Sequence, residues 1–133
     1  MRFLLFILII LSTRVVTYGQ QSLGLFSPKE AYNDIFTQKL SSDSNVTSIL
    51  IWIKKEVKPH KHVMHSEHVY VLQGAGKLLL GEKIMEVKEG DLIYIPPNTV
   101  HALKVTSPTP MKVLSVQAPE FDGKDRVAVE MEW

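Results

Sequence analysis

The chain contains no cysteine among its 133 residues. This absence excludes disulfide bonds, thiolate metal ligands, a cysteine nucleophile and a lipid-anchored cysteine. Excess charge is also missing, because 15 basic and 14 acidic residues give a formal net charge of +1. A chain this close to neutral lacks the basic footprint of a nucleic-acid-binding domain, so no nucleic-acid partner is expected. With 45% hydrophobic and 22% charged residues, the composition is that of one ordinary globular domain.

Long hydrophobic runs are scarce, and the unbroken one over residues 3–11 lies between Arg2 and Arg14. As a helix, these nine residues would span about 14 Å, roughly half of a membrane's hydrocarbon core. A positive start, a short apolar middle and a small-residue exit near Gly19 predict a cleaved secretory signal over residues 1–19. An uncleaved membrane anchor is the alternative. We therefore expect a secreted or periplasmic protein that has no membrane contact after cleavage. The mature chain would carry 13 basic and 14 acidic residues.

The segment that follows predicts a short helix. Ser27-Pro28-Lys29-Glu30 combines a capping box with proline at the first helical position. A helix through about residue 36 and a polar loop over residues 41–45 would then form an N-terminal unit, residues 20–45. We expect this unit to cover one end of the sheets.

From residue 46 onward, short β-rich runs alternate with turn signals. The predicted strands cover residues 46–57, 77–80, 83–87, 92–95, 101–105, 111–117 and 126–133. Strands this short, at this spacing, predict an all-β antiparallel sandwich or small barrel over residues 46–133.

Histidines gather in the middle of the chain. All five lie between positions 60 and 101, and His60, His62, His65 and His68 fall within nine residues, with Glu67 among them. Residues two apart on a strand point to the same face, so His60 and His62 would point together. Three neutral imidazoles and a carboxylate can hold Fe, Ni, Cu, Zn or Mn. The alternative is a set of solvent-facing histidines that bind metals only adventitiously.

Two motifs resemble those of the cupins. The first consists of His60-Lys61-His62, Glu67 and Gly74. The second consists of Gly90, Pro96 and His101. Together with the stretches 67–74 and 90–97, which also look like single-domain cupins, the resemblance covers roughly residues 46–118.

The resemblance implies a double-stranded β-helix, which is a jelly-roll barrel, and a set of metal ligands. In that family pattern His60, His62, Glu67 and His101 fall on the ligand positions, whereas His65 and His68 match none. For His65 this favours a place on the loop between ligands, with substitution for a ligand or support of one as the alternatives. Strand parity sends His68 to the opposite face from Glu67. The implied cofactor is one divalent ion, Fe, Mn, Ni or Zn.

Three positions depart from the family pattern. Lys54 and Asn98 stand where glycine is usual, and Val105 stands where the second motif often has Asn. Asparagine tolerates the left-handed backbone conformation better than most residues, so we expect the turn at Asn98 to survive. None of the three is a ligand position, so the departures affect the choice of subfamily and leave the metal prediction intact.

Strand parity also predicts the cavity wall. Alternate isoleucines of residues 49–53 share one face, and Val69 and Val71 share the face of Glu67. Met64 and Met85 are interpreted as flexible core filler. Cupins often dimerise through sheet packing, so a homodimer is expected, with Trp133 a candidate cover for an outer sheet face.

The function expected from the resemblance is that of an exported metalloprotein acting on a small organic substrate, with dioxygenase-like chemistry favoured over isomerisation. Four protein ligands on an octahedral ion would leave two positions for substrate or dioxygen. Alternatively, Glu67 leaves the metal and acts as a general base. Two other readings stay open, because fold does not settle function: a non-catalytic barrel that binds a metal and a sugar or acid, and an empty barrel.

Overall fold

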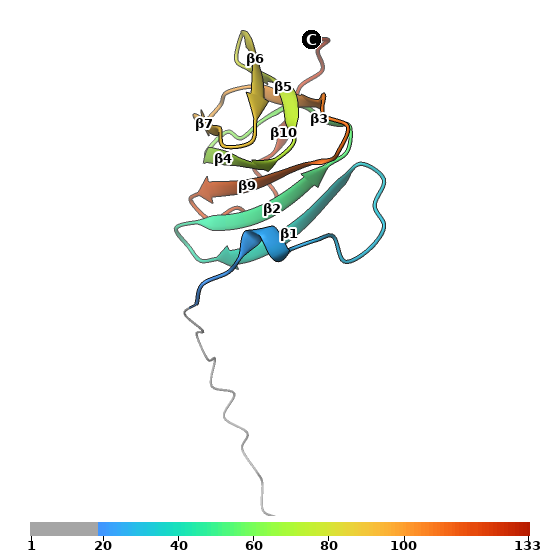
Figure 1. The fold of residues 1–133 in the computed structure, drawn as a ribbon. Coiled ribbons are helices and arrows are strands. Elements are labelled where there is room, and N and C mark those ends of the chain that lie inside the picture. Colours follow the sequence, from blue (N-terminus) through green and yellow to red (C-terminus); the bar gives the residue numbers. More distant parts are fainter. Residues whose placement is uncertain (1–18) are drawn as a thin grey trace, which may run out of the picture.

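The computed structural model describes residues 19–133, so the expected secretory signal lies outside the described residues except for Gly19. The fold consists of two antiparallel five-stranded sheets (Figure 1). The first sheet has the order β1 (Ile35–Ser42), β2 (Thr47–Ile53), β9 (Met111–Ala118), β4 (Ser66–Gln73), β7 (Leu92–Ile95). The second has the order β10 (Val127–Ala128), β3 (Glu56–Lys61), β8 (His101–Val105), β5 (Ala75–Leu80), β6 (Lys83–Lys88). The all-β class and the double-sheet jelly roll predicted from the sequence are confirmed. No helix within residues 19–133 is long and apolar enough to cross a membrane.

The helix predicted over residues 27–36 is wrong. The helical turn described in this region is the 3-10 helix η1 at Leu23–Leu25, and residues 29–34 form bends or irregular structure. From Ile35 the chain instead forms β1, which pairs antiparallel with β2 and sets Phe36 opposite Trp52. A capping box supplies only local hydrogen bonds, whereas pairing with β2 along an eight-residue strand supplies a ladder of backbone hydrogen bonds and partly buries alternate side chains.

Two predicted strands also differ from the structure. The strand predicted over residues 46–57 is divided at Lys54 and Lys55, where the chain leaves the first sheet and enters the second. The tail predicted as a strand over residues 126–133 pairs only through Val127 and Ala128. The hairpin of β5 and β6 and the strands β7, β8 and β9 form where they were predicted.

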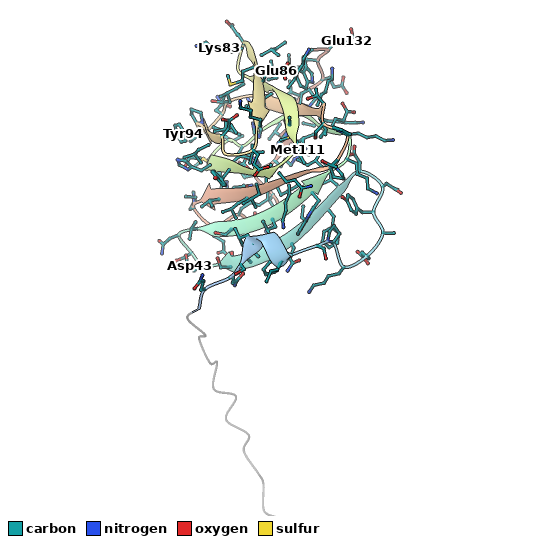
Figure 2. All side chains as sticks on the ribbon, in the orientation of Figure 1. Asp43, Lys83, Glu86, Tyr94, Met111 and Glu132 are labelled. Atoms are coloured by element: carbon teal, nitrogen blue, oxygen red, sulfur yellow. The ribbon has the colours of Figure 1, made fainter. Side chains whose placement is uncertain are left out.

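The inner faces of the two sheets meet in one apolar core. Its buried members come from both sheets: Ile53, Val71, Leu78, Val87, Ile93, Ile95, Leu103, Met111 and Val113. The alternation predicted for residues 49–53 and for Val69 and Val71 is confirmed, because these side chains line the interior with Glu67. Figure 2 shows Met111 between the sheets and Tyr94 projecting at the periphery, where Tyr94 is 51% exposed.

The N-terminal segment covers the outer face of the first sheet. The ammonium of Lys112 on β9 donates to the backbone carbonyls of Leu23 and Phe26, and lies 5.2 Å from the ring centre of Trp52. Lys112 and Trp52 are therefore only 5% and 6% exposed, although they face away from the core. At the other end of the chain, Trp133 lies against Lys104 on the outer face of β8.

Turn positions agree with the motifs. Asn98 has a φ of 59°, the left-handed conformation that was expected of it. Gly74 and Gly90, the glycines of the two motifs, also have positive φ values, 86° and 92°. Glycine adopts this region without the steric penalty that a Cβ would bring. The two motifs therefore contain residues that form turns as well as candidate metal ligands.

Candidate metal centre

Three histidines converge from neighbouring strands of the second sheet. His60 lies on β3 and is in register with His101, the first residue of β8, while His62 follows the end of β3. One nitrogen from each ring lies within 4.8 Å of the others. All three residues are buried, with 5%, 3% and 5% exposure for His60, His62 and His101. This buried group can hold a metal ion.

The backbone orients each of these rings. The Nδ1 atoms contact backbone carbonyl oxygens: His60 that of Lys58 at 2.8 Å, His62 that of Asp125 at 2.9 Å, and His101 that of Thr99 at 3.0 Å. A carbonyl oxygen only accepts, so each Nδ1 carries the proton and donates it. Each Nε2 is therefore left with a free lone pair. Metal-ligating histidines have this arrangement, because the outer hydrogen bond sets both tautomer and ring direction.

Burial keeps the imidazole of His60 neutral. Desolvation, reinforced by the nearby ring of His101, lowers the pKa of His60 to about 3. Desolvation also lowers the pKa of His62, although the Asp125 carbonyl and Glu67 oppose the shift. At neutral pH, His60 therefore accepts a metal ion without first losing a proton.

Glu67 enters the same space from β4 in the opposite sheet. Its Oε2 lies 3.6 Å from His62 Nε2 and 3.5 Å from His101 Nε2. Its Oε1 accepts a hydrogen bond from the Ser115 hydroxyl and a longer one, 3.4 Å, from the Gln117 amide. Burial raises the pKa of the carboxyl, but the contacts with His101 and Ser115 outweigh it, so the pKa is lowered and Glu67 is ionised at neutral pH.

The structure therefore brings together all four residues predicted as ligands, His60, His62, Glu67 and His101. The donor chemistry fits a divalent ion: three imidazole nitrogens face one carboxylate oxygen that has no other role. The Oε1 of Gln117 is buried and has no hydrogen-bond partner among the described residues, which leaves an acceptor beside the centre. That Glu67 binds the ion directly stays a prediction.

A cavity of about 410 Å³ extends from this centre into the barrel. Isoleucine, valine and leucine side chains make up most of its wall, and the histidines, Thr37, Glu67, Gln117 and Arg126 form its polar part. A concave apolar space with a few convergent polar groups is the usual form of a small-molecule site.

The other two histidines lie outside the centre. His68 is exposed on the far face of β4, where its ring stacks on Tyr94 at 4.9 Å, as strand parity predicted. His65 lies on the loop before β4, and both of its nitrogens are engaged, Nδ1 by the Asp125 carboxylate and Nε2 by the Glu120 carbonyl at 2.8 Å. Met64 is 71% exposed, so its interpretation as core filler is wrong, whereas Met85 packs partly buried against the core.

Sequence reasoning missed the groups that surround the four predicted ligands. Ser115 and Gln117 are two polar residues, two apart, in the otherwise mostly apolar strand β9, and that pattern was a usable signal. Asp125, Arg126 and Phe121 come from the irregular segment after β9, and nothing in their local sequence indicates that this segment returns to the barrel opening. Phe121 contacts the rings of both His62 and His65 edge-on, with centroids 5.3 and 5.4 Å away.

Comparison with known proteins agrees with the fold and the motifs. The cupin domain profile matches residues 50–117. An uncharacterized protein of Aquifex aeolicus is 35% identical over 120 residues, which cover 80% of this chain and 98% of that protein. The mannose-1-phosphate guanylyltransferase RfbM of Salmonella typhimurium is 32% identical over 110 residues, 81% of this chain, but the match spans only 22% of RfbM.

Solved structures show the same fold. Streptomyces Pac13, described as a nucleoside dehydratase, superposes with a TM-score of 0.66 over 88% of this chain and 95% of that one, at 22% identity. Likeness at this identity concerns architecture alone. With the profile match over half of the chain and a full-length relative at 35% identity, the chain belongs to the cupin family.

Proposed function

We propose that this cupin is a metal-dependent enzyme that acts on a small organic substrate, with dioxygenase-like chemistry favoured. One observation carries the proposal: three Nε2 lone pairs and the Glu67 Oε2 converge at the polar end of an apolar cavity of about 410 Å³. A structural ion would need no cavity beside it, whereas a catalytic ion needs an open position that substrate can reach.

In this proposal each group of residues at the centre has its own role. His60, His62 and His101 would hold the ion, which when bound supplies a Lewis acid and, if it is redox-active, a site for dioxygen chemistry. Ser115 and Gln117 fix Oε1 of Glu67, so Oε2 is the oxygen that either completes the ligand set or takes a proton from substrate. The apolar wall excludes water from the reacting groups, which strengthens electrostatic interactions there.

The alternative is a barrel that binds a metal and a small ligand without catalysis. A sugar ligand is the weaker form of it, because the wall offers few hydrogen-bonding groups for hydroxyls. The name of RfbM concerns a sugar phosphate, but this chain spans about a fifth of that protein. The dehydratase activity named for Pac13 supports keeping non-oxidative chemistry, including isomerisation, as the second enzymatic candidate.

Metal content and oxygen uptake test the proposal. Untagged protein is expected to retain close to one divalent ion per chain by elemental analysis, and to rebind Fe, Mn, Ni or Zn after chelation. Iron- or manganese-loaded protein is then tested in an oxygen electrode with diols, flavonoids and thiol acids, with the zinc-loaded protein as a redox-inert control. Protein that binds no metal would refute both the enzyme and the metal-dependent binder. Metal binding without turnover would favour the binder.

Export and dimerisation stay predictions. Secretion rests on the sequence of residues 1–19 and is tested by sequencing the N-terminus of protein recovered from the expressing cells and their medium. A dimer formed by sheet packing would cover Tyr70, Leu92 and Tyr94, which are 40%, 66% and 51% exposed on the outer face of β4 and β7. Sedimentation equilibrium measures the mass, and a monomer would contradict the dimer.

A further inference from the structure

The cavity wall contains one permanent positive charge. Among the described residues that line it, Arg126 is the one lysine or arginine, and its guanidinium is cationic at every physiological pH. The remaining wall is apolar apart from the three histidines, Thr37, Gln117 and Glu67. The guanidinium of Arg126 is itself exposed, so it is both part of this largely apolar wall and accessible from solvent.

The backbone on both sides of Arg126 is anchored. The carboxylate of the preceding residue, Asp125, accepts hydrogen bonds from the amides of Val63, Met64 and His65 at 2.9–3.0 Å. Immediately after Arg126, β10 pairs with β3, so that Ala128 stands opposite His60. The chain around Arg126 is therefore tied to the same loop and strand that present the metal-centre histidines, while the segment farther along makes few such bonds.

No internal partner explains this anchored charge. Within residues 19–133, Arg126 makes no ion pair and no side-chain hydrogen bond. The carboxylate in the cavity wall, Glu67, has Oε1 engaged by Ser115 and Oε2 facing His62 and His101. Burial slightly disfavours the guanidinium charge, and Glu67 compensates only from a distance. The guanidinium of Arg126 is exposed and unpaired among the described residues, so it is free to bind an anion from outside the chain.

We propose that Arg126 binds the carboxylate of a small organic acid whose apolar body fills the cavity next to the metal centre. This deepens the proposed function and rests on it. A guanidinium presents two parallel N–H donors that match a carboxylate, and such charge-assisted pairs are stronger than neutral hydrogen bonds. One arginine suits a monoanion, and a bound divalent ion beside it would add to the attraction. The cavity volume, about 410 Å³, suits a small molecule with an apolar body.

Paired probes that differ only in charge test this assignment. Zinc-loaded protein at pH 7.5 is titrated with phenylacetate, with its neutral analogue phenylacetamide and with phenyl phosphate, and dissociation constants come from calorimetry. The proteins compared are wild type, Arg126→Gln, Arg126→Lys and the control Lys124→Gln. Lys124 belongs to the same segment but pairs with Asp122 and does not line the cavity. Zinc content is measured in every sample.

We expect wild type and Lys124→Gln to bind phenylacetate at least about tenfold more tightly than phenylacetamide, a preference of about 1.4 kcal/mol. Arg126→Gln should abolish this preference with zinc content unchanged, and Arg126→Lys should keep part of it. The inference is overturned if wild type binds no phenylacetate, if the preference survives in Arg126→Gln, or if phenyl phosphate binds more tightly than phenylacetate. If zinc does not bind, the proposed function fails, and the same titrations of zinc-free protein still decide the role of Arg126.

Discussion

His60 and His65 lie five residues apart in the chain, and their environments are opposite. The imidazole of His60 is buried with His62 and His101, donates from Nδ1 to a backbone carbonyl and leaves Nε2 open to the cavity. The imidazole of His65 has both nitrogens engaged, by Asp125 and by the Glu120 carbonyl. Burial lowers the pKa of His60 to about 3, whereas at His65 the contacts with Asp125 and Glu120 outweigh burial and raise the pKa.

The difference shows that histidines close together in the sequence have separate roles. His60 belongs to the candidate metal centre, whereas His65 and Asp125 form a structural clamp, a hydrogen-bonded pair that holds the loop before β4. A histidine held neutral with a free lone pair can bind a metal, while one held next to a carboxylate becomes a cation that fixes a loop. The two sites are joined through Asp125, because its backbone carbonyl orients His62 and its carboxylate holds His65. The clamp therefore helps to position the centre, and a mutation that weakens the clamp should also affect the centre.

Removal of a centre histidine is expected to have the largest effect. His101→Ala deletes one of the three converging nitrogens. Mutation of a residue that only hydrogen-bonds to a metal ligand already lowers metal affinity by about 10–100-fold. The loss on deleting a ligand itself should exceed that range. Metal affinity is measured by competition with a chromophoric chelator. His68→Ala, on the outer face of β4, is the matched control and should retain wild-type affinity. Equal losses in both variants would contradict the assignment of the centre.

Much of this centre could be predicted from the sequence. Strand parity puts His60 and His62 on one face, and the resemblance to the cupins implied Glu67 and His101 as the other ligands. The hydrogen-bond partners that orient the rings could not be predicted. They are the backbone carbonyls of Lys58, Thr99 and Asp125, and every residue has such a carbonyl whatever its side chain. Only the path of the folded chain brings them there.

The fold was predicted where short β-rich runs are bounded by turn signals, as at β7 and β9. It was missed in the tail, residues 126–133, of which only Val127 and Ala128 pair with β3. The capping box at Ser27-Pro28-Lys29-Glu30 is a local signal, and pairing of β1 with β2 overrides it from Ile35 onward. Likewise, nothing near Arg126 in the sequence shows that it returns to the cavity.

Weakening the clamp should have the next largest effect, and it should reach the centre. Asp125→Asn removes the charge that pairs with His65 and places an amide donor against backbone amides of residues 63–65. Lost hydrogen bonds to a charged group predict a decrease of about 1–3 kcal/mol in the free energy of unfolding. Metal affinity should fall by about tenfold, because His62 is oriented by the same residue.

Urea unfolding and metal competition measure these two effects. Asp122→Asn is the control, because Asp122 lies three residues away, pairs with exposed Lys124 and acts on His65 only as a weak, distant charge. It should change both quantities much less than Asp125→Asn does. If Asp125→Asn lowers stability but leaves metal affinity unchanged, the clamp and the centre are independent, and the coupling described above is wrong.

A smaller effect is expected from the hydroxyl that holds Glu67. Ser115→Ala leaves Oε1 of Glu67 with only the long contact from Gln117, so the carboxylate loses its fixed direction. Metal affinity should fall by up to about tenfold, with the clamp intact. Ser66→Ala is the control, since its hydroxyl reaches only the Ala118 carbonyl at 3.5 Å. Unchanged affinity in Ser115→Ala would indicate that Glu67 does not bind the ion and would leave it the role of a base.

The smallest expected effect is on how folding stability depends on pH, and its sign is opposite for His65 and His60. The folded pKa of His65 lies above its unfolded value of about 6.5, so its stabilising contribution is fully present below that pH and is lost as pH rises through the folded pKa. The folded pKa of His60, about 3, lies below the unfolded value, so protonation of the unfolded chain lowers stability as pH falls from about 6.5 toward 3.

Urea unfolding of metal-free protein at several pH values separates the two. The stability lost in His65→Gln should be larger at pH 6 than at pH 9, because the contribution of the imidazole cation paired with Asp125 is fully present below about pH 6.5 and declines as pH rises through the folded pKa. His60→Gln should show the reverse, with its gain over wild type growing as pH falls from 7 to 5. His68→Gln, on the outer face, is the control for both. If the His65→Gln difference grows toward pH 9, then His65 is neutral in the folded protein, and the contrast between clamp and centre disappears.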